Sequence, residues 1–316
     1  MTNGSGEARG PAGSTAPGQP SHGHPHRSGA QPTADIGRLL LRCPDSHGII
    51  ASVSAFLAEA GANIISLDQH STAPEGGTFV QRAIFHLPGL PAAIDELQQR
   101  FGATVAERFA MDYRFAEAAK PKRVAIMASK ADHCLLDLLW RNRRGELEMT
   151  VAMVISNHPD LAEQVRPFGV PFFHIPATRE TRAEAEQRQL QLLCGNVDLV
   201  VLARYMQIIT GEFIETVGCP LINIHHSFLP AFIGAAPYQR ARERGVKLIG
   251  ATAHYVTEIL DEGPIIEQDV VRVDHTHTVS DLVRLGADVE RAVLSRAVQW
   301  HCQDRVIRVD NETVVL

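Results

Sequence analysis

The sequence predicts an α/β protein with two domains, a ferredoxin-like domain followed by a doubly wound, mostly parallel sheet. Residues 36–113 carry short strand-like and helix-like segments in the order β-α-β-β-α-β, which is the order of the ferredoxin-like fold. From Arg123 onwards, near-continuous apolar runs alternate with longer amphipathic segments, as expected for parallel strands that helices cover on both faces. A chain of 316 residues, 45% of them hydrophobic, has room for two such cores.

The elements of the first domain follow from hydrophobic periodicity and from turn residues. In chain order we expect a strand at Leu39–Arg42, a helix with Ile49, Val53, Phe56 and Leu57 at helical spacing, strands at 63–70 and 78–87, a helix at 90–102 and a last strand at 103–113. The charged, Ala-rich segment 114–121 is expected to be a linker.

The second domain, residues 122–316, is expected to contain four buried parallel strands, at 123–129, 149–156, 197–204 and 220–226. Helices are predicted between them at 133–145 and 181–195. Open sheets of this kind bind ligands beyond the carboxyl ends of their strands.

Composition narrows the class of protein. Residues 1–35 contain almost no large apolar side chain, so this segment is predicted to be a disordered tail. The net charge of −6 and an aromatic content of 6% argue against a nucleic-acid partner. The 5 cysteines are widely scattered, without a CxxC pair, which favours a reducing cytoplasm over a disulfide framework or a zinc ribbon. No apolar run reaches membrane-spanning length.

Two loops carry the polar groups that point to chemistry. Asn223 and His225 end the apolar run "LINIH", and Asp261 stands in the loop "LDEG", 36 residues after His225 (261 − 225). An amide, an imidazole and a carboxylate are sufficient for acyl transfer or hydrolysis without a metal. Taken singly, each has a structural reading: a strand end that meets solvent, or a turn-forming aspartate.

Other kinds of site find less support in the sequence. No GxSxG elbow, Walker loop or GxGxxG after a strand is present, which argues against a serine hydrolase and common nucleotide cradles. His275 and His277, in "DHTHT", are expected on one face of a strand. With no third ligand at a matching spacing, they are read as structural rather than as a metal site.

The stretches "INIHHSFLPAFIGAAPY" and "GATAHYVTEILDEGPII" resemble the signature of the 10-formyltetrahydrofolate-dependent formyltransferase fold. The resemblance implies a catalytic triad of Asn223, His225 and Asp261, with His254 as a further active-site histidine. Together with "CPDSHGIIA", "SKADHCLLDLL", "ARYMQIIT" and "VDHTHTVSDL", these motifs resemble the formyltetrahydrofolate deformylase family from about residue 37 to Leu316. The substrate implied is 10-formyltetrahydrofolate, bound in part by Met206, Gln207 and Ile208, with no metal and no separate cofactor.

The same resemblance implies that the first domain is an ACT domain, which senses small amino acids such as glycine or methionine. Asp45 and Gly48 then belong to the effector loop, and a second copy of the chain adds Asn63 and Ile64, so that a homo-oligomer is expected. A purely structural oligomerisation module is the alternative.

The sequence of one turn indicates whether the formyl group is transferred to water or to an amine. The turn "ASKADHCLLDLL" follows the first strand of the second domain and has no glycine. In the related glycinamide ribonucleotide formyltransferases, a Gly-rich loop there holds the acceptor's phosphate. Lys130 and His133 could still attract an anion, but a snug phosphate cradle is not expected, and water is left as the acceptor. A formyltransferase with an amine acceptor and an inactive amino-acid-sensing protein remain as alternatives.

Overall fold

The computed structural model describes Met1 and residues 33–73, 75–230 and 237–316. The predicted disordered tail therefore lies almost entirely outside the described residues. The elements below all belong to one compact unit, Pro32–Leu316. Within the described residues, no helix is long and apolar enough to cross a membrane.

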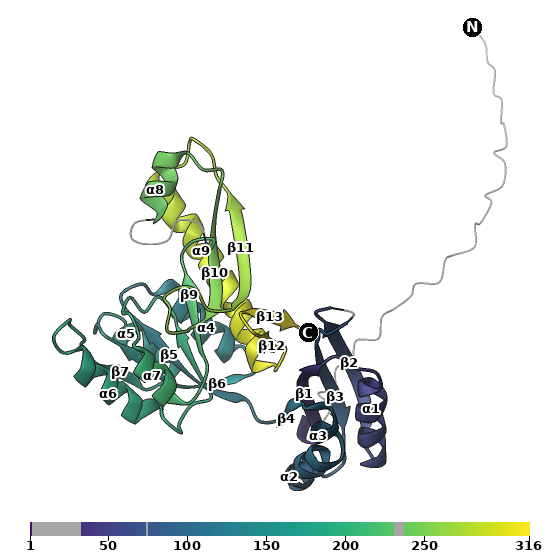
Figure 1. The fold of residues 1–316 in the computed structure, drawn as a ribbon. Coiled ribbons are helices and arrows are strands. Elements are labelled where there is room, and N and C mark those ends of the chain that lie inside the picture. Colours follow the sequence, from purple (N-terminus) through teal and green to yellow (C-terminus); the bar gives the residue numbers. More distant parts are fainter. Residues whose placement is uncertain (2–32, 74, 231–236) are drawn as a thin grey trace. The chain divides into compact units, whose positions relative to one another are not determined.

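The first domain is an antiparallel sheet with helices, as predicted (Figure 1). Its sheet order is β2-β3-β1-β4, in which Leu41 of β1 pairs with Gln81 of β3 and with Tyr113 of β4. Its elements are β1 (Ile36–Pro44), α1 (Ile49–Glu59), β2 (Asn63–Ser71), β3 (Thr78–His86), α2 (Leu90–Phe101), α3 (Glu107–Phe109) and β4 (Asp112–Glu117), with a 3-10 turn at Thr33–Asp35 and a π-helical turn at Gly102–Ala106.

The predicted strand at 103–113 is wrong over most of its length. Residues 102–109 continue helix α2 through the π-helical turn into α3. Phe101, Val105 and Phe109 recur every four residues and pack on the core of the domain, which is the spacing of one helix face. The fourth strand starts only at Asp112 and ends at Glu117, so it takes up half of the expected linker.

The second domain is built on a seven-stranded sheet of order β11-β10-β9-β8-β5-β6-β7. Strands β7, β6, β5, β8 and β9 pair in parallel, and β10 and β11 add antiparallel at one edge. Its elements are β5 (Lys122–Ala128), α4 (His133–Arg143), β6 (Met149–Ser156), α5 (Ala162–Val165), a 3-10 turn at Arg166–Phe168, β7 (Phe172–His174), α6 (Arg182–Leu193), β8 (Leu199–Leu202), α7 (Gly211–Val217), β9 (Leu221–His225), α8 (Pro237–Arg244), β10 (Leu248–Tyr255), β11 (Ile265–Arg272), α9 (Val279–Cys302), β12 (Val306–Val309) and β13 (Glu312–Val315).

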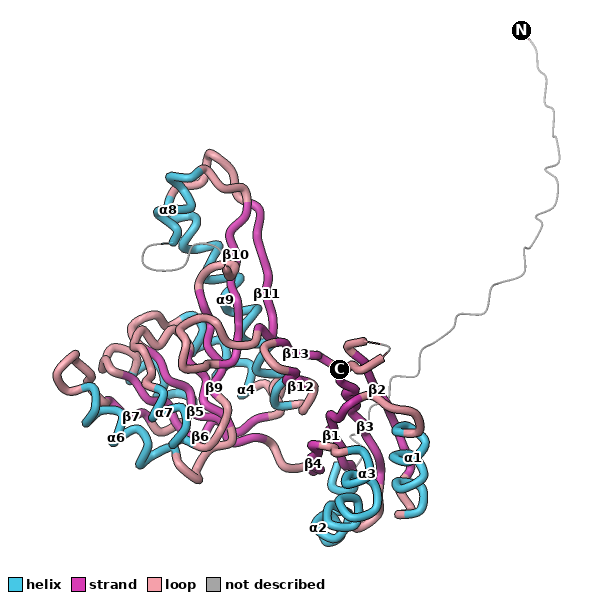
Figure 2. Tube along the Cα trace, in the orientation of Figure 1, coloured by secondary structure: helices cyan, strands magenta, loops and turns pink. Residues whose placement is uncertain are grey.

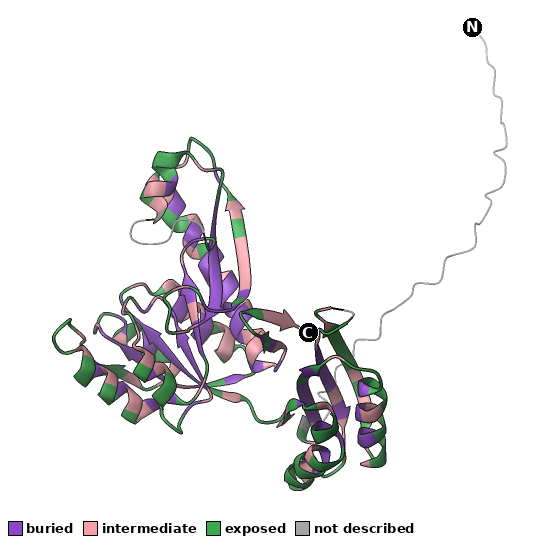
Figure 3. Ribbon diagram, in the orientation of Figure 1, coloured by how far each residue is buried: buried purple, intermediate pink, exposed green. Residues whose placement is uncertain are grey.

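Helices cover both faces of this sheet, which explains why its central strands β5, β6 and β8 are almost continuously apolar (Figures 2 and 3). On β5, Ile126 packs in a core that includes side chains of α4 and α9, and the adjacent Met127 packs in a core with α6 and α7. Because neighbouring residues of a strand face opposite sides, both sides must be apolar. The expected doubly wound arrangement is confirmed.

The expected strand around His275 and His277 is wrong. Residues 273–278 form a loop between β11 and α9. Thr278 caps α9, where its hydroxyl accepts from the amide of Asp281 and the Asp281 side chain bonds back to Thr278. This reciprocal cap starts a helix immediately after the histidines, so an extended strand cannot run through them.

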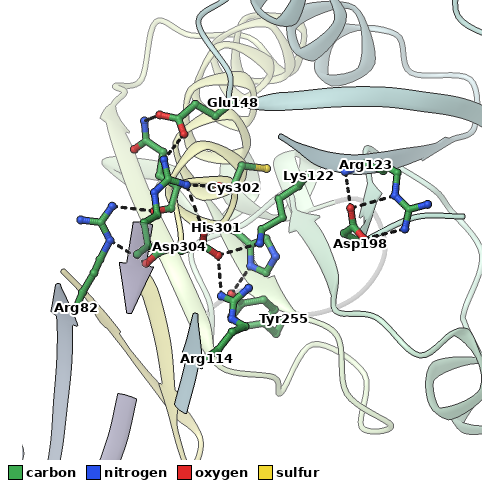
Figure 4. Close-up of polar contacts among 12 residues, drawn as sticks. Arg82, Arg114, Lys122, Arg123, Glu148, Asp198, Tyr255, His301, Cys302 and Asp304 are labelled. Carbon is green, nitrogen blue, oxygen red and sulfur yellow. Dashed lines mark hydrogen bonds and ion pairs between the residues drawn. The ribbon is translucent and has the colours of Figure 1, made fainter. Parts of the chain in front are cut away.

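A buried carboxylate follows α9 and gathers cations from both domains (Figure 4). Asp304 lies 2.7 Å from Arg114 Nη2 of β4, 3.0 Å from Lys122 Nζ of β5 and 3.3 Å from Arg38 Nη1 of β1. Its main-chain carbonyl accepts from Arg82 of β3 at 2.9 Å. The Asp304 side chain is only 1% exposed, so these cations are what make its burial tolerable.

Candidate active site

The carboxyl end of β9 opens into a cavity of about 450 Å³. Asn223 and His225 lie on this strand, and both line the cavity together with His226. The register of the parallel strands pairs Asn223 with Leu202 of β8, so the ends of two adjacent strands meet here. This is the edge at which ligands of open α/β sheets bind, and the volume suits a small organic ligand.

Asp261 reaches the cavity from the loop between β10 and β11. Its φ of 60° lies in the left-handed region that aspartate tolerates better than most residues. The loop closes on itself through a hydrogen bond from Tyr255 N to Pro264 O of 2.9 Å. Any side chain at Gly263 would have its Cβ 1.8 Å from the Tyr255 carbonyl oxygen. The D-x-G spacing is thus a steric requirement of the turn that presents Asp261.

His225 and Asp261 form a buried pair. His225 Nδ1 lies 3.2 Å from Asp261 Oδ2, and their side chains are 8% and 10% exposed. With Nδ1 directed at a carboxylate, that nitrogen carries a proton. Nε2 of His225 is buried and has no hydrogen-bond partner in the described structure. Since His225 lines the cavity, this nitrogen is the one left for a ligand.

Burial alone would raise the pKa of the Asp261 carboxyl. The hydrogen bond from His225 at 3.2 Å and the nearby imidazole of His254 outweigh burial and hold this pKa well below its usual range. Asp261 is therefore ionised throughout the neutral pH range, and its negative charge orients the imidazole of His225.

His254 completes the group at the cavity wall. A β-bulge between Ala253 and His254 re-aims the strand here, as bulges beside functional sites do. His254 Nδ1 donates to the Tyr255 carbonyl at 2.9 Å, and its Nε2 lies 3.3 Å from Asn223 Nδ2 and 3.6 Å from Asp261 Oδ1. All four residues expected from the two loops are thus brought together.

The segment after β8 lines the mouth of the cavity. Met206, Gln207 and Ile208 all border it, and Met206 and Ile208 are 59% and 57% exposed. The Met206 amide donates to Ser129 Oγ at 2.9 Å, and that hydroxyl donates to Asn157 Oδ1 at 2.7 Å. These bonds fix the backbone at Met206 and leave the apolar side chains of Met206 and Ile208 exposed, where they could contact a ring of the ligand.

Four residues form a cluster around a buried carboxylate near His226; of these, only His133 carries a sequence-based expectation, as a residue that could attract an anion. Glu290 accepts hydrogen bonds from His133 Nε2 and from the Tyr238 hydroxyl, each at 2.8 Å, and Arg204 Nε lies 3.5 Å from Glu290 Oε2. We call these residues, His133, Arg204, Tyr238 and Glu290, the Glu290 cluster. One signal was available: Glu290 falls on the apolar face of α9 between Gly286 and Val293.

Burial, more than the Glu290 cluster, keeps the neighbouring imidazole of His226 uncharged, because Arg204 and Glu290 act on it in opposite directions. Burial, and then the positive charge of Arg204, lower the pKa of His226 to about 4. His226 is therefore a neutral ring at the cavity wall at physiological pH. The pKa of Glu290 is itself lowered, because its hydrogen bond from His133 and the charge of Arg204 outweigh burial.

His133, Cys134 and Glu290 place three possible metal-ligand atoms within 4.8 Å of one another. However, both carboxylate oxygens of Glu290 already accept hydrogen bonds, and the Arg204 guanidinium lies against one of them. Burial also raises the pKa of the Cys134 thiol well above its usual value, which opposes formation of the thiolate that binds metals. The group is better described as a hydrogen-bonded cluster.

The effector residues expected from the sequence lie at opposite ends of the first domain. Asp45 and Gly48 stand in the turn between β1 and α1, where Gly48 has a φ of 89°. Asn63 begins β2 and pairs with His86, at the far end of the sheet, and Ile64 follows it. One chain therefore does not bring the two pairs together, so a shared site would need a second copy.

Comparison with known proteins places both domains. A family model described as formyl transferase matches residues 122–298, and one described as ACT domain matches residues 37–102. The chain is 84% identical over 282 residues to a formyltetrahydrofolate deformylase of Mycobacterium tuberculosis, covering 89% of this chain and 91% of that relative. The corresponding relative in Bacillus subtilis is 53% identical, with 89% and 94% covered.

A solved structure gives the same result at the level of the fold. A formyltetrahydrofolate deformylase of Pseudomonas syringae superposes with a TM-score of 0.85 at 46% identity, covering 89% of this chain and 94% of that one. The similarity therefore extends across both domains and includes the strands that carry the cavity.

Proposed function

The chain belongs to the formyltetrahydrofolate deformylase family, and from this premise we propose that it hydrolyses the linear amide bond of 10-formyltetrahydrofolate to give tetrahydrofolate and formate. The observation that supports these residues is the His225–Asp261 pair: His225 lines the cavity together with Asn223, and its Nε2 has no hydrogen-bond partner in the described structure. The reaction belongs to one-carbon metabolism and would supply formate for purine biosynthesis.

The site suggests a role for each member of the triad. Asn223 and protonated His225 stabilise the oxyanion that forms when water adds to the formyl carbon. Asp261 holds His225 in position and helps to remove a proton from the attacking water. This proton is then delivered to the leaving nitrogen as the C–N bond breaks. Met206, Gln207, Ile208 and His254 are the residues that we expect to hold the folate.

The test is to incubate the purified protein with 10-formyltetrahydrofolate and to measure formate with no amine acceptor present. Release of formate at a rate proportional to enzyme supports hydrolysis. Formyl transfer that requires an added amine would instead support a formyltransferase, and substrate binding without turnover would support an inactive sensor. The glycine-free turn after β5 favours the first outcome, since it offers no phosphate cradle for an acceptor.

We expect the reaction to need no metal and no cofactor, because an amide, an imidazole and a carboxylate provide the required acid–base and oxyanion groups. Formate release should therefore persist after exhaustive dialysis against EDTA, followed by assay in metal-free buffer. If EDTA abolishes the activity and zinc restores it, His133, Cys134 and Glu290 must be reinterpreted as ligands.

The ACT domain supports regulation by a small molecule, and we propose glycine or methionine as the effector at Asp45, Gly48, Asn63 and Ile64. Since Asp45 and Asn63 lie at opposite ends of the sheet, we infer a homo-oligomer in which each site takes residues from two chains. No nucleic acid or membrane partner is proposed. A cytoplasmic location fits a chain whose described cysteines are all free.

Adding glycine or methionine to the full-length enzyme should change the apparent affinity for the folate by about 5- to 150-fold, which is the usual range for coupling between two sites. The measurement is formate release against folate concentration at several effector concentrations. Asp45→Asn and Asn63→Ala should each abolish the response, and Asp310→Asn, at an exposed turn, should not.

The shared site has a sharper test. In a mixed oligomer of Asp45→Asn and Asn63→Ala chains, some sites combine an intact Asp45 with an intact Asn63, so part of the response should return. If neither amino acid alters the rate of the wild type, the domain is structural only. If mixing restores nothing, the site is not shared between chains.

A further inference from the structure

Arg204 holds an unfavourable backbone conformation beside the catalytic pair. It follows β8 by two residues, and the pairing of Leu202 with Asn223 brings it alongside His225 at the end of the neighbouring strand. Its φ of 62° lies in the left-handed region, which disfavours a residue with a long side chain. Such outliers persist where surrounding structure enforces them, and they cluster at functional sites.

The Glu290 cluster places a buried carboxylate beside the Arg204 side chain. Glu290 is 2% exposed and lies 3.5 Å from Arg204 Nε, while His133 and Tyr238 hold both carboxylate oxygens. Gly286 of α9 gives the Tyr238 hydroxyl its space, because a Cβ there would lie 1.9 Å from that oxygen. Residues from three helices, His133 of α4, Tyr238 of α8 and Glu290 of α9, thus place one carboxylate beside the guanidinium.

The guanidinium nevertheless lacks part of its hydrogen bonding. Nε and Nη1 of Arg204 are buried and have no hydrogen-bond partner in the described structure, and the Glu290 contact is an ion pair too loose to satisfy them. Buried donors of a folded protein are nearly always paired. Because Arg204 lines the same cavity as Asn223, His225 and His226, a ligand in that cavity can supply the missing acceptor.

The chemistry of the proposed reaction identifies that acceptor. When water adds to the formyl carbon and the C–N bond breaks, one proton of that water goes to the folate nitrogen, and the formic acid formed loses the other to solvent and leaves as formate. Hydrolysis therefore creates a carboxylate where the substrate had a neutral amide. Transfer to an amine would create no anion. Guanidinium is the group best matched to a carboxylate, since its planar fork donates two parallel hydrogen bonds.

We propose that Arg204 is a product-binding residue that receives the carboxylate of formate as it forms, and that the Glu290 cluster positions Arg204 for this task. The inference rests on the proposed hydrolysis and adds a ligand, a small monocarboxylate, and a residue outside the triad. It also explains a cluster that supplies neither the oxyanion donor nor the base.

The test uses a substitution that is compatible with the left-handed backbone conformation at this position. Arg204→Gly removes the guanidinium, and glycine adopts a φ of 62° without strain. We expect formate to inhibit this variant about 10- to 100-fold more weakly than the wild type, which is the usual loss for a hydrogen bond to a charged group. The rate should also fall, and added guanidinium ion at non-denaturing concentration should restore part of it. Arg204→Lys, which retains the charge without the fork, should lie between the two.

Lys247→Gln is the matched control, because it removes an exposed cation immediately before β10, at a residue that does not line the cavity. It should leave inhibition by formate unchanged. Binding of carbon-13-labelled formate, followed by NMR titration of the full-length chain, gives a readout independent of turnover and should show the same loss in Arg204→Gly alone.

Two results would overturn the assignment. Equal formate affinity in the wild type and Arg204→Gly, with the fold intact by circular dichroism, would show that Arg204 does not bind the product. Equal loss in Lys247→Gln would show a diffuse electrostatic effect. Both outcomes leave hydrolysis by the wild type standing, whereas failure of the wild type to release formate would refute the proposed reaction itself.

Discussion

Asp261→Asn is expected to lower the rate of formate release by about 10²- to 10⁴-fold, the usual contribution of a positioned acid–base group. Asparagine keeps the shape of the side chain and tolerates the left-handed backbone at this position, where φ is 60°. It removes the anion that orients His225 at 3.2 Å. The loss should appear in kcat, while binding of tetrahydrofolate, measured by fluorescence quenching, should largely survive.

Glu262→Gln is the control for this variant, since it removes an exposed carboxylate from the next residue. It should leave the rate within about twofold of the wild type, as surface substitutions usually do. Because the pKa of Asp261 lies well below its usual range, its own protonation should cause no loss of rate between about pH 5 and 8. Near-normal turnover in Asp261→Asn would remove Asp261 from the catalytic group.

The fold was predictable wherever the spacing of apolar residues fitted a helix or a strand but not both. In the first domain, Ile49, Val53, Phe56 and Leu57 are all buried on α1 as expected. The buried strands of the second domain also lie where their apolar runs predicted them. The prediction failed at 103–113, because Val105, Phe109 and Met111 stand at even spacings that fit one face of a strand, while Val105 and Phe109 also fit one face of a helix. The burial of the adjacent residues Val105 and Ala106 in the same core distinguishes the two, because neighbours on a strand face opposite sides.

The grouping of the candidate catalytic residues was predictable because the strand topology determines where they lie. Strand ends that carry Asn223, His225 and His254 meet at one edge, and the Asp261 loop closes over them. Arg204 and Glu290 were not found, because they lie 86 residues apart (290 − 204) and no local spacing connects them. Their relation depends on how α9 packs against the sheet, which periodicity alone does not specify.

Asp304→Asn is expected to destabilise the protein by about 3–5 kcal/mol, the range found when one partner of a buried ion pair is removed. The side chain of Arg38 is 9% exposed and that of Lys122 is 16% exposed, so both cations would lose a carboxylate in a poorly solvated place. Arg38 retains Glu148 as a partner, which favours the lower end of the range. The measurement is urea unfolding at neutral pH, and the midpoint should fall with little change in slope.

The effect of Asp304→Asn should also depend on pH in a defined direction. Burial alone would raise the pKa of Asp304, but the charges of Arg114, Lys122 and Arg38 outweigh it and lower this pKa. A group whose pKa is depressed in the folded state contributes stability above its unfolded pKa, about 3.9, and that contribution is lost as the pH falls through the folded value. The difference between wild type and variant should therefore be constant above about pH 5 and shrink in acid.

The control is Asp310→Asn, because Asp310 also has a left-handed backbone, with a φ of 51° against 54° at Asp304, but is exposed. The same chemical change there should alter the unfolding free energy by no more than about 0.5 kcal/mol. If both variants unfold alike, the Asp304 cations are solvated well enough to lose their partner without penalty. If Asp304→Asn alone is destabilised, and only above the acid range, the buried charge of Asp304 stabilises the contact between the sheet of the first domain and the end of α9.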